Sequence, residues 1–290
     1  MRRSILCAVL FLAAVASAPA ASHPKGHLVI IGGGSRTKEI MCTFVRLAGG
    51  RNASVVVFPM ASGDAEETGR EQRDELLGDS IARCISLNLT REQANSDSIV
   101  RLLDRTTGVF FSGGDQSRLT AALKGTRVEQ RLHEIYQQGG VIGGTSAGAA
   151  VMSEIMITGD ELLNKDTVNA FTFIRKNNIK TIPGFGFVTA AIVDQHFVKR
   201  KRHNRLISVV LEHPSLLGIG IDESTAIIVN PNNTFTVAGE SLVFVYDASR
   251  ANPVGLNYKG MLSGSPLALH ILQAGEVFNF KTRRVVTVRP

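Results

Sequence analysis

Apolar residues along this chain gather in short unbroken runs that are separated by amphipathic stretches. Three of the runs are HLVIIGGG (27–34), SVVVFPMAS (54–62) and TTGVFFSGGDQ (106–116). Short apolar runs bounded by glycine or proline are typical of strands that are buried on both faces. We therefore expect a sheet whose strands end in glycine-rich or polar loops.

The stretches between these runs have helical periodicity. Residues 66–77 and 128–136 are amphipathic, and Val128, Leu132 and Ile135 fall on one helical face. Gly139 then provides a residue suited to a left-handed C-terminal cap. Strands that alternate with helices predict an α/β fold, with a mainly parallel sheet covered by helices on both faces.

The last third of the chain has a different pattern. GIGIDESTAIIVN (218–230), NTFTVAG (233–239), SLVFVYD (241–247) and RRVVTVRP (283–290) are short strand-like segments with turn signals between them. We expect them to form extra C-terminal strands, as an antiparallel extension. Because no linker-like stretch interrupts the chain, residues 21–290 are predicted to form a single domain.

The N-terminus has the pattern of a secretory signal. Arg2 and Arg3 precede an apolar run over residues 5–15, which small residues follow. The run is too short for a stable membrane anchor, although an uncleaved anchor is the alternative. We expect residues 1–20 to be removed and the mature protein to be secreted or periplasmic. Removal lowers the net charge from +7 to +5, since two arginines and no acidic residue are lost.

Signal cleavage also removes Cys7 and leaves Cys42 and Cys84. In an oxidising compartment these two cysteines either pair or remain isolated thiols, and the sequence leaves both outcomes open. No cluster of cysteines and histidines has metal-ligand spacing, so we expect no metal and no cofactor.

Gly144–Thr145–Ser146–Ala147–Gly148 fits the G-x-S-x-G nucleophile elbow. The segment lies between a strand-like run and a run of small helix-forming residues. Small neighbours allow the tight turn that exposes the serine hydroxyl, and the amide of Ala147 would face a developing oxyanion. An ordinary strand-to-helix turn is the alternative interpretation of this pattern.

A serine nucleophile needs a base, and His196 is the best-placed histidine. It follows the apolar run AAIV, at the kind of strand end where α/β enzymes place functional loops. Asp194 and Gln195 precede it and could orient it. Asp222 and Glu223 also follow a strand-like run, and either acid could orient a histidine.

Two further segments carry candidate binding residues. The loop SGGDQ (112–116) could supply the second oxyanion donor through Gly114. Five basic residues follow His196 at the start of an expected helix, where cations oppose the helix dipole. They suit a carboxylate or phosphate site, or else form a solvated basic face; they are Lys199, Arg200, Lys201, Arg202 and Arg205.

Together these motifs resemble the cyanophycinase family, serine exopeptidases related to the aspartyl dipeptidases. The resemblance rests on GGDQ (113–116), GTSAGAAVM (144–152), DQHF (194–197), R-x-R-x-x-R (200–205) and GIGIDE (218–223). It implies a class I glutamine-amidotransferase-like fold and a triad of Ser146, His196 and Glu223. It also implies these pocket residues: Gln116, Asp194, Gln195, Arg200, Arg202 and Arg205. Some relatives take the acid from the position of Asp160 or Glu161 instead.

The substrate that the resemblance implies is cyanophycin, a polyaspartate whose β-carboxyl groups carry arginine. Its free carboxylates suit planar arginine forks, and its guanidinium groups need an acceptor such as Asp194. An aspartyl dipeptidase and a catalytically silent secreted homologue are the alternatives. A nucleic-acid binder lacks support, because no aromatic residues are interleaved with the basic ones. The sequence leaves open whether the chain is a monomer or a homodimer.

Overall fold

The structure is a computed structural model, and it describes residues 24–78, 81–163 and 170–286. The expected signal segment, residues 1–20, lies outside the described residues. Within the described residues, no helix combines the length and the apolarity that crossing a membrane requires.

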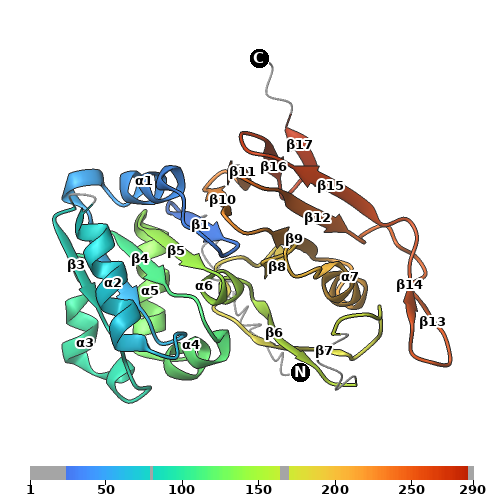
Figure 1. Cartoon of the computed structure of the whole chain (residues 1–290), viewed down its shortest axis with the longest axis horizontal. Helices are drawn as coiled ribbons and strands as arrows, with labels where there is room; N and C mark the ends of the chain where they lie inside the picture. Colours follow the sequence, from blue (N-terminus) through green and yellow to red (C-terminus); the bar gives the residue numbers. More distant parts are fainter. Residues whose placement is uncertain (1–23, 79–80, 164–169, 287–290) are drawn as a thin grey trace, which may run out of the picture.

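A nine-stranded sheet forms one part of the molecule (Figure 1). Five of its strands are adjacent and parallel, as the apolar runs predict. In sheet order these strands are β1 (His27–Ile31), β5 (Val141–Thr145), β4 (Gly108–Phe111), β2 (Ser54–Phe58) and β3 (Arg83–Ser86). Each predicted strand is shorter than its apolar run, because the glycine or proline at the end of the run begins the following loop.

Helices cover both faces of these parallel strands, as expected. Side chains of alternate strand residues point to opposite faces, so Val29 packs with α1 in one core cluster and Leu28 packs with α4 and α5 in the other. The described helices are α1 (Lys38–Leu47), α2 (Ala65–Gly78), α3 (Asp97–Leu102), α4 (Gln116–Leu123), α5 (Arg127–Gln138), α6 (Ala147–Ala150) and α7 (His203–Glu212). Gly139 caps α5 in a left-handed conformation, which confirms the predicted cap.

The C-terminal strands divide between two sheets, whereas the sequence predicts one extension. The antiparallel extension of the main sheet contains β10 (Thr225–Asn230), β11 (Thr234–Gly239), β16 (Val277–Asn279) and β17 (Arg284–Val286). A separate four-stranded sheet contains β8 (Ala191–Gln195), β9 (Leu217–Ile221), β12 (Val243–Asp247) and β15 (Ala268–Leu272). The segment GIGIDESTAIIVN therefore supplies β9 to one sheet and β10 to the other, and β9 pairs with β8 in parallel.

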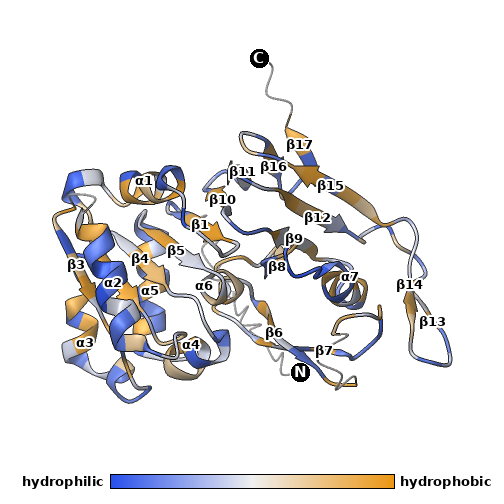
Figure 2. Cartoon of the chain, viewed as in Figure 1, coloured by the Kyte–Doolittle hydropathy of each residue, from blue (hydrophilic) through white to orange (hydrophobic). Residues whose placement is uncertain are grey.

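Two antiparallel two-stranded sheets lie outside these larger sheets: β6 (Ile155–Glu161) with β7 (Ile179–Pro183), and β13 (Gly255–Leu256) with β14 (Leu262–Ser263). Figure 2 shows hydrophobic residues concentrated on central strands such as β1 and β4, while α2 is mostly hydrophilic. The two described cysteines are not paired: Cys42 is exposed on α1, and Cys84 is buried on β3. Burial raises the pKa of the Cys84 thiol to about 12, so this thiol is unreactive.

Candidate active site

Ser146 occupies a strained turn between β5 and α6. Its backbone has φ 54° and ψ −108°, a conformation that residues other than glycine rarely adopt. The Ser146 N–H donates to the carbonyl oxygen of Ile31 at 3.0 Å, which ties the turn to the end of β1. Strain of this kind persists only where the surroundings hold it, and it is common at functional sites.

The neighbouring glycines are required by close packing of the backbone. A side-chain carbon on Gly144 would collide with the carbonyl of Gly148, and one on Gly148 would collide with the carbonyl of Phe111. The turn therefore folds tightly only with small residues at both positions, which is the physical basis of the G-x-S-x-G pattern. The helix that follows has only four residues, so it contributes little dipole of its own.

His196 comes directly after β8, and its imidazole contacts the Ser146 hydroxyl. The distance from His196 Nε2 to Ser146 Oγ is 2.8 Å. His196 is 7% exposed, and its backbone also has a positive φ, of 47°. Two residues that are 50 positions apart are thus brought together in conformations that the fold must enforce.

Glu223 completes a continuous chain of hydrogen bonds. The distance from its Oε1 to His196 Nδ1 is 2.6 Å. The alternative acids have other partners: Glu161 accepts from Asn178, and Asp160 pairs with Lys180 at 3.2 Å. Of the acids that the sequence offers, the structure therefore brings Glu223 against the imidazole.

The glycines that follow β1 surround this pair of residues, a role that the sequence analysis missed. The carbonyl of Gly32 accepts from the His196 N–H at 2.7 Å, and the carbonyl of Gly33 accepts from the Ser224 N–H at 2.8 Å. Gly33 also lies against the imidazole ring. Three consecutive glycines after a buried strand were the available signal, because such a run permits close approach by another chain segment.

The electrostatic environment keeps the imidazole neutral. Burial lowers the pKa of His196, and the positive charges of Arg200 and Arg202 lower it further, whereas the hydrogen bond that the ring donates to Glu223 raises it. The net shift is downward, so His196 can accept a proton at neutral pH. Two of the predicted binding residues, Arg200 and Arg202, therefore act electrostatically on the imidazole.

Of the five basic residues after His196, Arg202 and Arg205 are buried, whereas Lys199, Arg200 and Lys201 are exposed. Arg205 is 1% exposed, and its Nε and Nη2 both donate to Asp194, with Nε at 2.7 Å from Oδ2. Arg202 donates to the carbonyl of Gln195 at 2.6 Å, while Arg200 is exposed. The helix α7 begins at His203. Arg200 and Arg202 therefore lie in the turn before the helix, and they are not residues of its first turn.

Two buried polar atoms in this group have no hydrogen-bond partner within the described residues: Arg205 Nη1 and Gln195 Oε1. Gln116 donates its side-chain amide to the carbonyl of Ile157 at 2.8 Å, which ties α4 to β6. The loop SGGDQ (112–116) also lies beside the serine, because a side-chain carbon on Gly113 would be 3.4 Å from Ser146 Cβ. Gly114 follows it in that loop.

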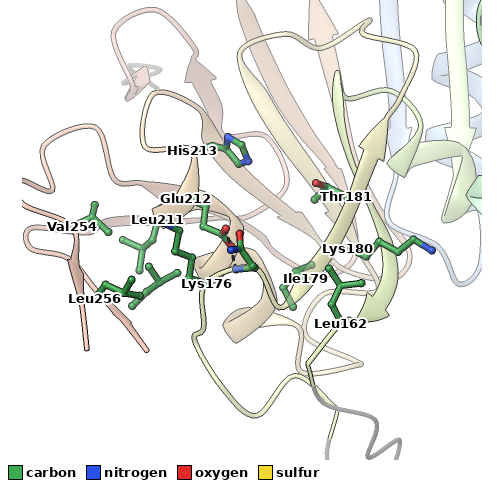
Figure 3. A pocket seen from close by; sticks show the side chains of 12 residues that line it. Leu162, Lys176, Ile179, Lys180, Thr181, Leu211, Glu212, His213, Val254 and Leu256 are labelled. Atoms are coloured by element: carbon green, nitrogen blue, oxygen red, sulfur yellow. Dashed lines mark hydrogen bonds between the residues drawn. The ribbon is translucent and has the colours of Figure 1, made fainter. Parts of the chain in front are cut away.

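A cavity of about 640 Å³ lies elsewhere, at the C-terminal end of α7 (Figure 3). Its lining includes Lys176, Glu212 and His213, and it contains none of the predicted site residues. Since α7 has ten residues, its two ends are about 15 Å apart. The cavity therefore does not coincide with the candidate catalytic residues. The hydrogen-bonded chain at Ser146 marks the candidate active site instead. No group of three or more metal-ligating side chains occurs within residues 24–78, 81–163 and 170–286.

Comparison with known proteins places the chain in a family. The sequence profile of peptidase family S51 matches residues 28–237. A cyanophycinase from Synechococcus elongatus is 36% identical over 276 residues, which cover 91% of this chain and 82% of that protein. A cyanophycinase from a Nostoc species is 34% identical over 274 residues, covering 90% and 88% respectively.

A solved structure has the same fold. The crystal structure of a peptidase from an acI-B1 actinobacterium matches with a TM-score of 0.64 and 22% identity, covering 89% of this chain and 98% of that one. Its likeness agrees with the predicted α/β class. The profile match extends over most of the chain and includes the serine turn, the histidine and the acid. The chain therefore belongs to peptidase family S51, a family of serine-type peptidases.

Proposed function

We propose that this chain is an exopeptidase that degrades cyanophycin and releases β-aspartyl-arginine dipeptides. In this proposal Ser146 is the nucleophile, His196 the general base and Glu223 the acid of the triad. The observation that carries it is the unbroken chain of hydrogen bonds from Ser146 Oγ to Glu223, in a chain that is 36% identical to a cyanophycinase.

The geometry suits acyl transfer. With Nδ1–H donated to Glu223, His196 Nε2 accepts the hydroxyl proton as Ser146 Oγ attacks the carbonyl carbon of an aspartyl–aspartyl peptide bond. The imidazolium then gives that proton to the leaving amine. Water attacks the acyl-enzyme by the same route and restores the serine. We propose the amides of Gly114 and Ala147 as donors to the oxyanion.

The charges beside the triad suit the proposed substrate. Each cyanophycin unit carries the free carboxylate of its arginine. Arg200 is exposed and close enough to His196 to lower its pKa, so we propose it as the residue that meets a substrate carboxylate. Arg202, with Gln116, would line the pocket. Arg205 Nη1 and Gln195 Oε1 would add one donor and one acceptor, while Asp194 is occupied by Arg205.

The test is incubation of the purified mature protein with cyanophycin, followed by mass spectrometry of the soluble products. We expect β-aspartyl-arginine dipeptides from the wild type. Replacing a triad nucleophile costs about 10⁶-fold in turnover, so a folded Ser146→Ala variant should release none. If the protein instead hydrolyses aspartyl dipeptides to free amino acids and does not hydrolyse cyanophycin, the result supports the dipeptidase alternative. Activity in Ser146→Ala would contradict the serine mechanism.

We further propose that the mature chain acts outside the cytoplasm, where it would degrade scavenged polymer. The support is the sequence pattern of residues 1–20, with two arginines, an apolar run and small residues. Expression of the full chain, with fractionation and N-terminal sequencing of the product, tests this. Retention of Met1 in a cytoplasmic product would contradict it.

A further inference from the structure

Asp222, the residue before Glu223, makes a set of hydrogen bonds that the proposed triad does not explain. It follows β9 and is 8% exposed. Its Oδ1 accepts the backbone N–H groups of Val198 and Lys199, both at 3.0 Å. Its Oδ2 accepts the hydroxyl of Ser241 at 2.8 Å. Both carboxylate oxygens are therefore used, and two of the three donors belong to the turn after His196.

The backbone of His196 and of the turn after it has an unfavourable conformation. His196 has a positive φ of 47°, and Lys201 has one of 52°. Within the turn, the carbonyl of His196 accepts from the Arg200 N–H at 2.9 Å. A bulky residue in this conformation persists only if its neighbours hold it. The carbonyl of Gly32 accepts a hydrogen bond from the His196 N–H, and Asp222 accepts hydrogen bonds from the N–H groups of Val198 and Lys199.

The carboxylate is suited to this task because it remains ionised. Burial opposes ionisation of Asp222, but the hydrogen bonds from the Lys199 N–H, Ser241 and the Val198 N–H outweigh it and lower the pKa of the group. Hydrogen bonds to an ionised acceptor are stronger than those between neutral groups.

We infer that Asp222 is a positioning residue that fixes the turn after His196 and so aims the imidazole at Ser146. The inference rests on the proposed function, and it assigns the two adjacent acids to different tasks. Glu223 bonds to the imidazole ring, whereas Asp222 holds the backbone that carries the ring. Neither the family resemblance nor the triad assigns Asp222 this role.

The test compares Asp222→Ala with Asp222→Asn. The alanine variant loses all three hydrogen bonds. The asparagine variant can keep them, because its carbonyl oxygen still accepts both backbone N–H groups while its amide donates to the Ser241 hydroxyl, which can also accept. Two rates are measured: kcat on cyanophycin, and labelling of Ser146 by a small fluorophosphonate, which does not depend on the substrate pocket.

We expect Asp222→Ala to lower both rates by about 10- to 100-fold, since a misplacement near 1 Å has effects of this size. KM should change by less than about threefold, and Asp222→Asn should restore most of both rates. Ser241→Ala is the matched control, because it removes only the outer hydrogen bond and should cost far less. If Asp222→Ala does not fold, Asp222→Ser replaces it, since its short side chain cannot reach both N–H groups.

Wild-type labelling of Ser146 in a folded Asp222→Ala protein would overturn the inference, as would an asparagine variant as impaired as the alanine variant. The first result would mean a purely structural role, and the second would mean that charge and not geometry matters. Failure of the proposed function gives a different result, because the wild type would then release no β-aspartyl-arginine dipeptides from cyanophycin, while fluorophosphonate labelling of Ser146 would still compare the Asp222 variants.

Discussion

The glycine loop after β1 provides a direct test of how closely the imidazole is packed. A β-carbon added at Gly33 would lie 2.3 Å from His196 Cε1, the nearest ring atom, whereas ordinary contact begins at 3.4 Å. Gly33→Ala therefore requires the ring to move by roughly 1.1 Å, the difference between these distances. A displacement near 1 Å costs about 10²-fold in rate. We expect kcat to fall by about that factor.

The same change also strains the backbone, since Gly33 has φ +109°, and that cost must be separated from the clash. Gly49 has φ +113°, but a β-carbon there would have its nearest neighbour at 3.7 Å, in ordinary contact. Gly49→Ala should therefore lose about 1–2 kcal/mol of stability while keeping its activity. Both variants are assayed for kcat and for urea-induced unfolding. Equal kcat values in the two variants would refute the argument from packing.

Three further predictions concern the charged residues. Glu223→Gln should lower kcat strongly with little change in KM, whereas Glu161→Gln should leave kcat nearly unchanged; the reverse result would move the acid to β6. Arg200→Gln removes a positive charge that lowers the pKa of His196, so that pKa should rise and the acidic limb of the kcat/KM profile should move to higher pH; a shift to lower pH would contradict this sign. Arg205→Lys keeps the charge but loses one of two hydrogen bonds to its buried partner, so urea-induced unfolding should show a loss of about 1.5–3 kcal/mol; wild-type stability would contradict it.

Much of the fold could be predicted because its signals are local. The parallel strands β1, β2 and β4 come from short apolar runs that glycine or proline closes, and the alternation with helices indicates the α/β class. The edge strand β3 (Arg83–Ser86) has no such run and was not predicted. Assignment of β9 and β12 to a second sheet could not be predicted in this way. Strand partners far apart in sequence are selected by tertiary packing, and β9 and β10 are both short apolar segments that are almost wholly buried.

The site was predictable to a similar extent. The glycines around Ser146 are required by the tight turn itself, so the spacing of GTSAG identifies the turn. The burial of Arg205 has a different cause, since its partner Asp194 comes from the neighbouring strand β8. A run of basic residues has the same appearance whether its members face solvent or a buried carboxylate. For the same reason the residues alone left open which of Asp222 and Glu223 meets the imidazole; the family resemblance favoured Glu223, and nothing in the sequence indicated that Asp222 holds a backbone turn.

The three residues of the proposed triad belong to two different sheets. Ser146 follows β5 in the nine-stranded sheet, while His196 and Glu223 follow β8 and β9 in the four-stranded sheet. The hydrogen bond between Ser146 and His196 therefore crosses from one sheet to the other, and the two sheets share one hydrophobic core. The distance between the nucleophile and its base is thus set by how these sheets pack against each other. We expect a condition that loosens this packing to lower the rate of hydrolysis before the parallel strands unfold.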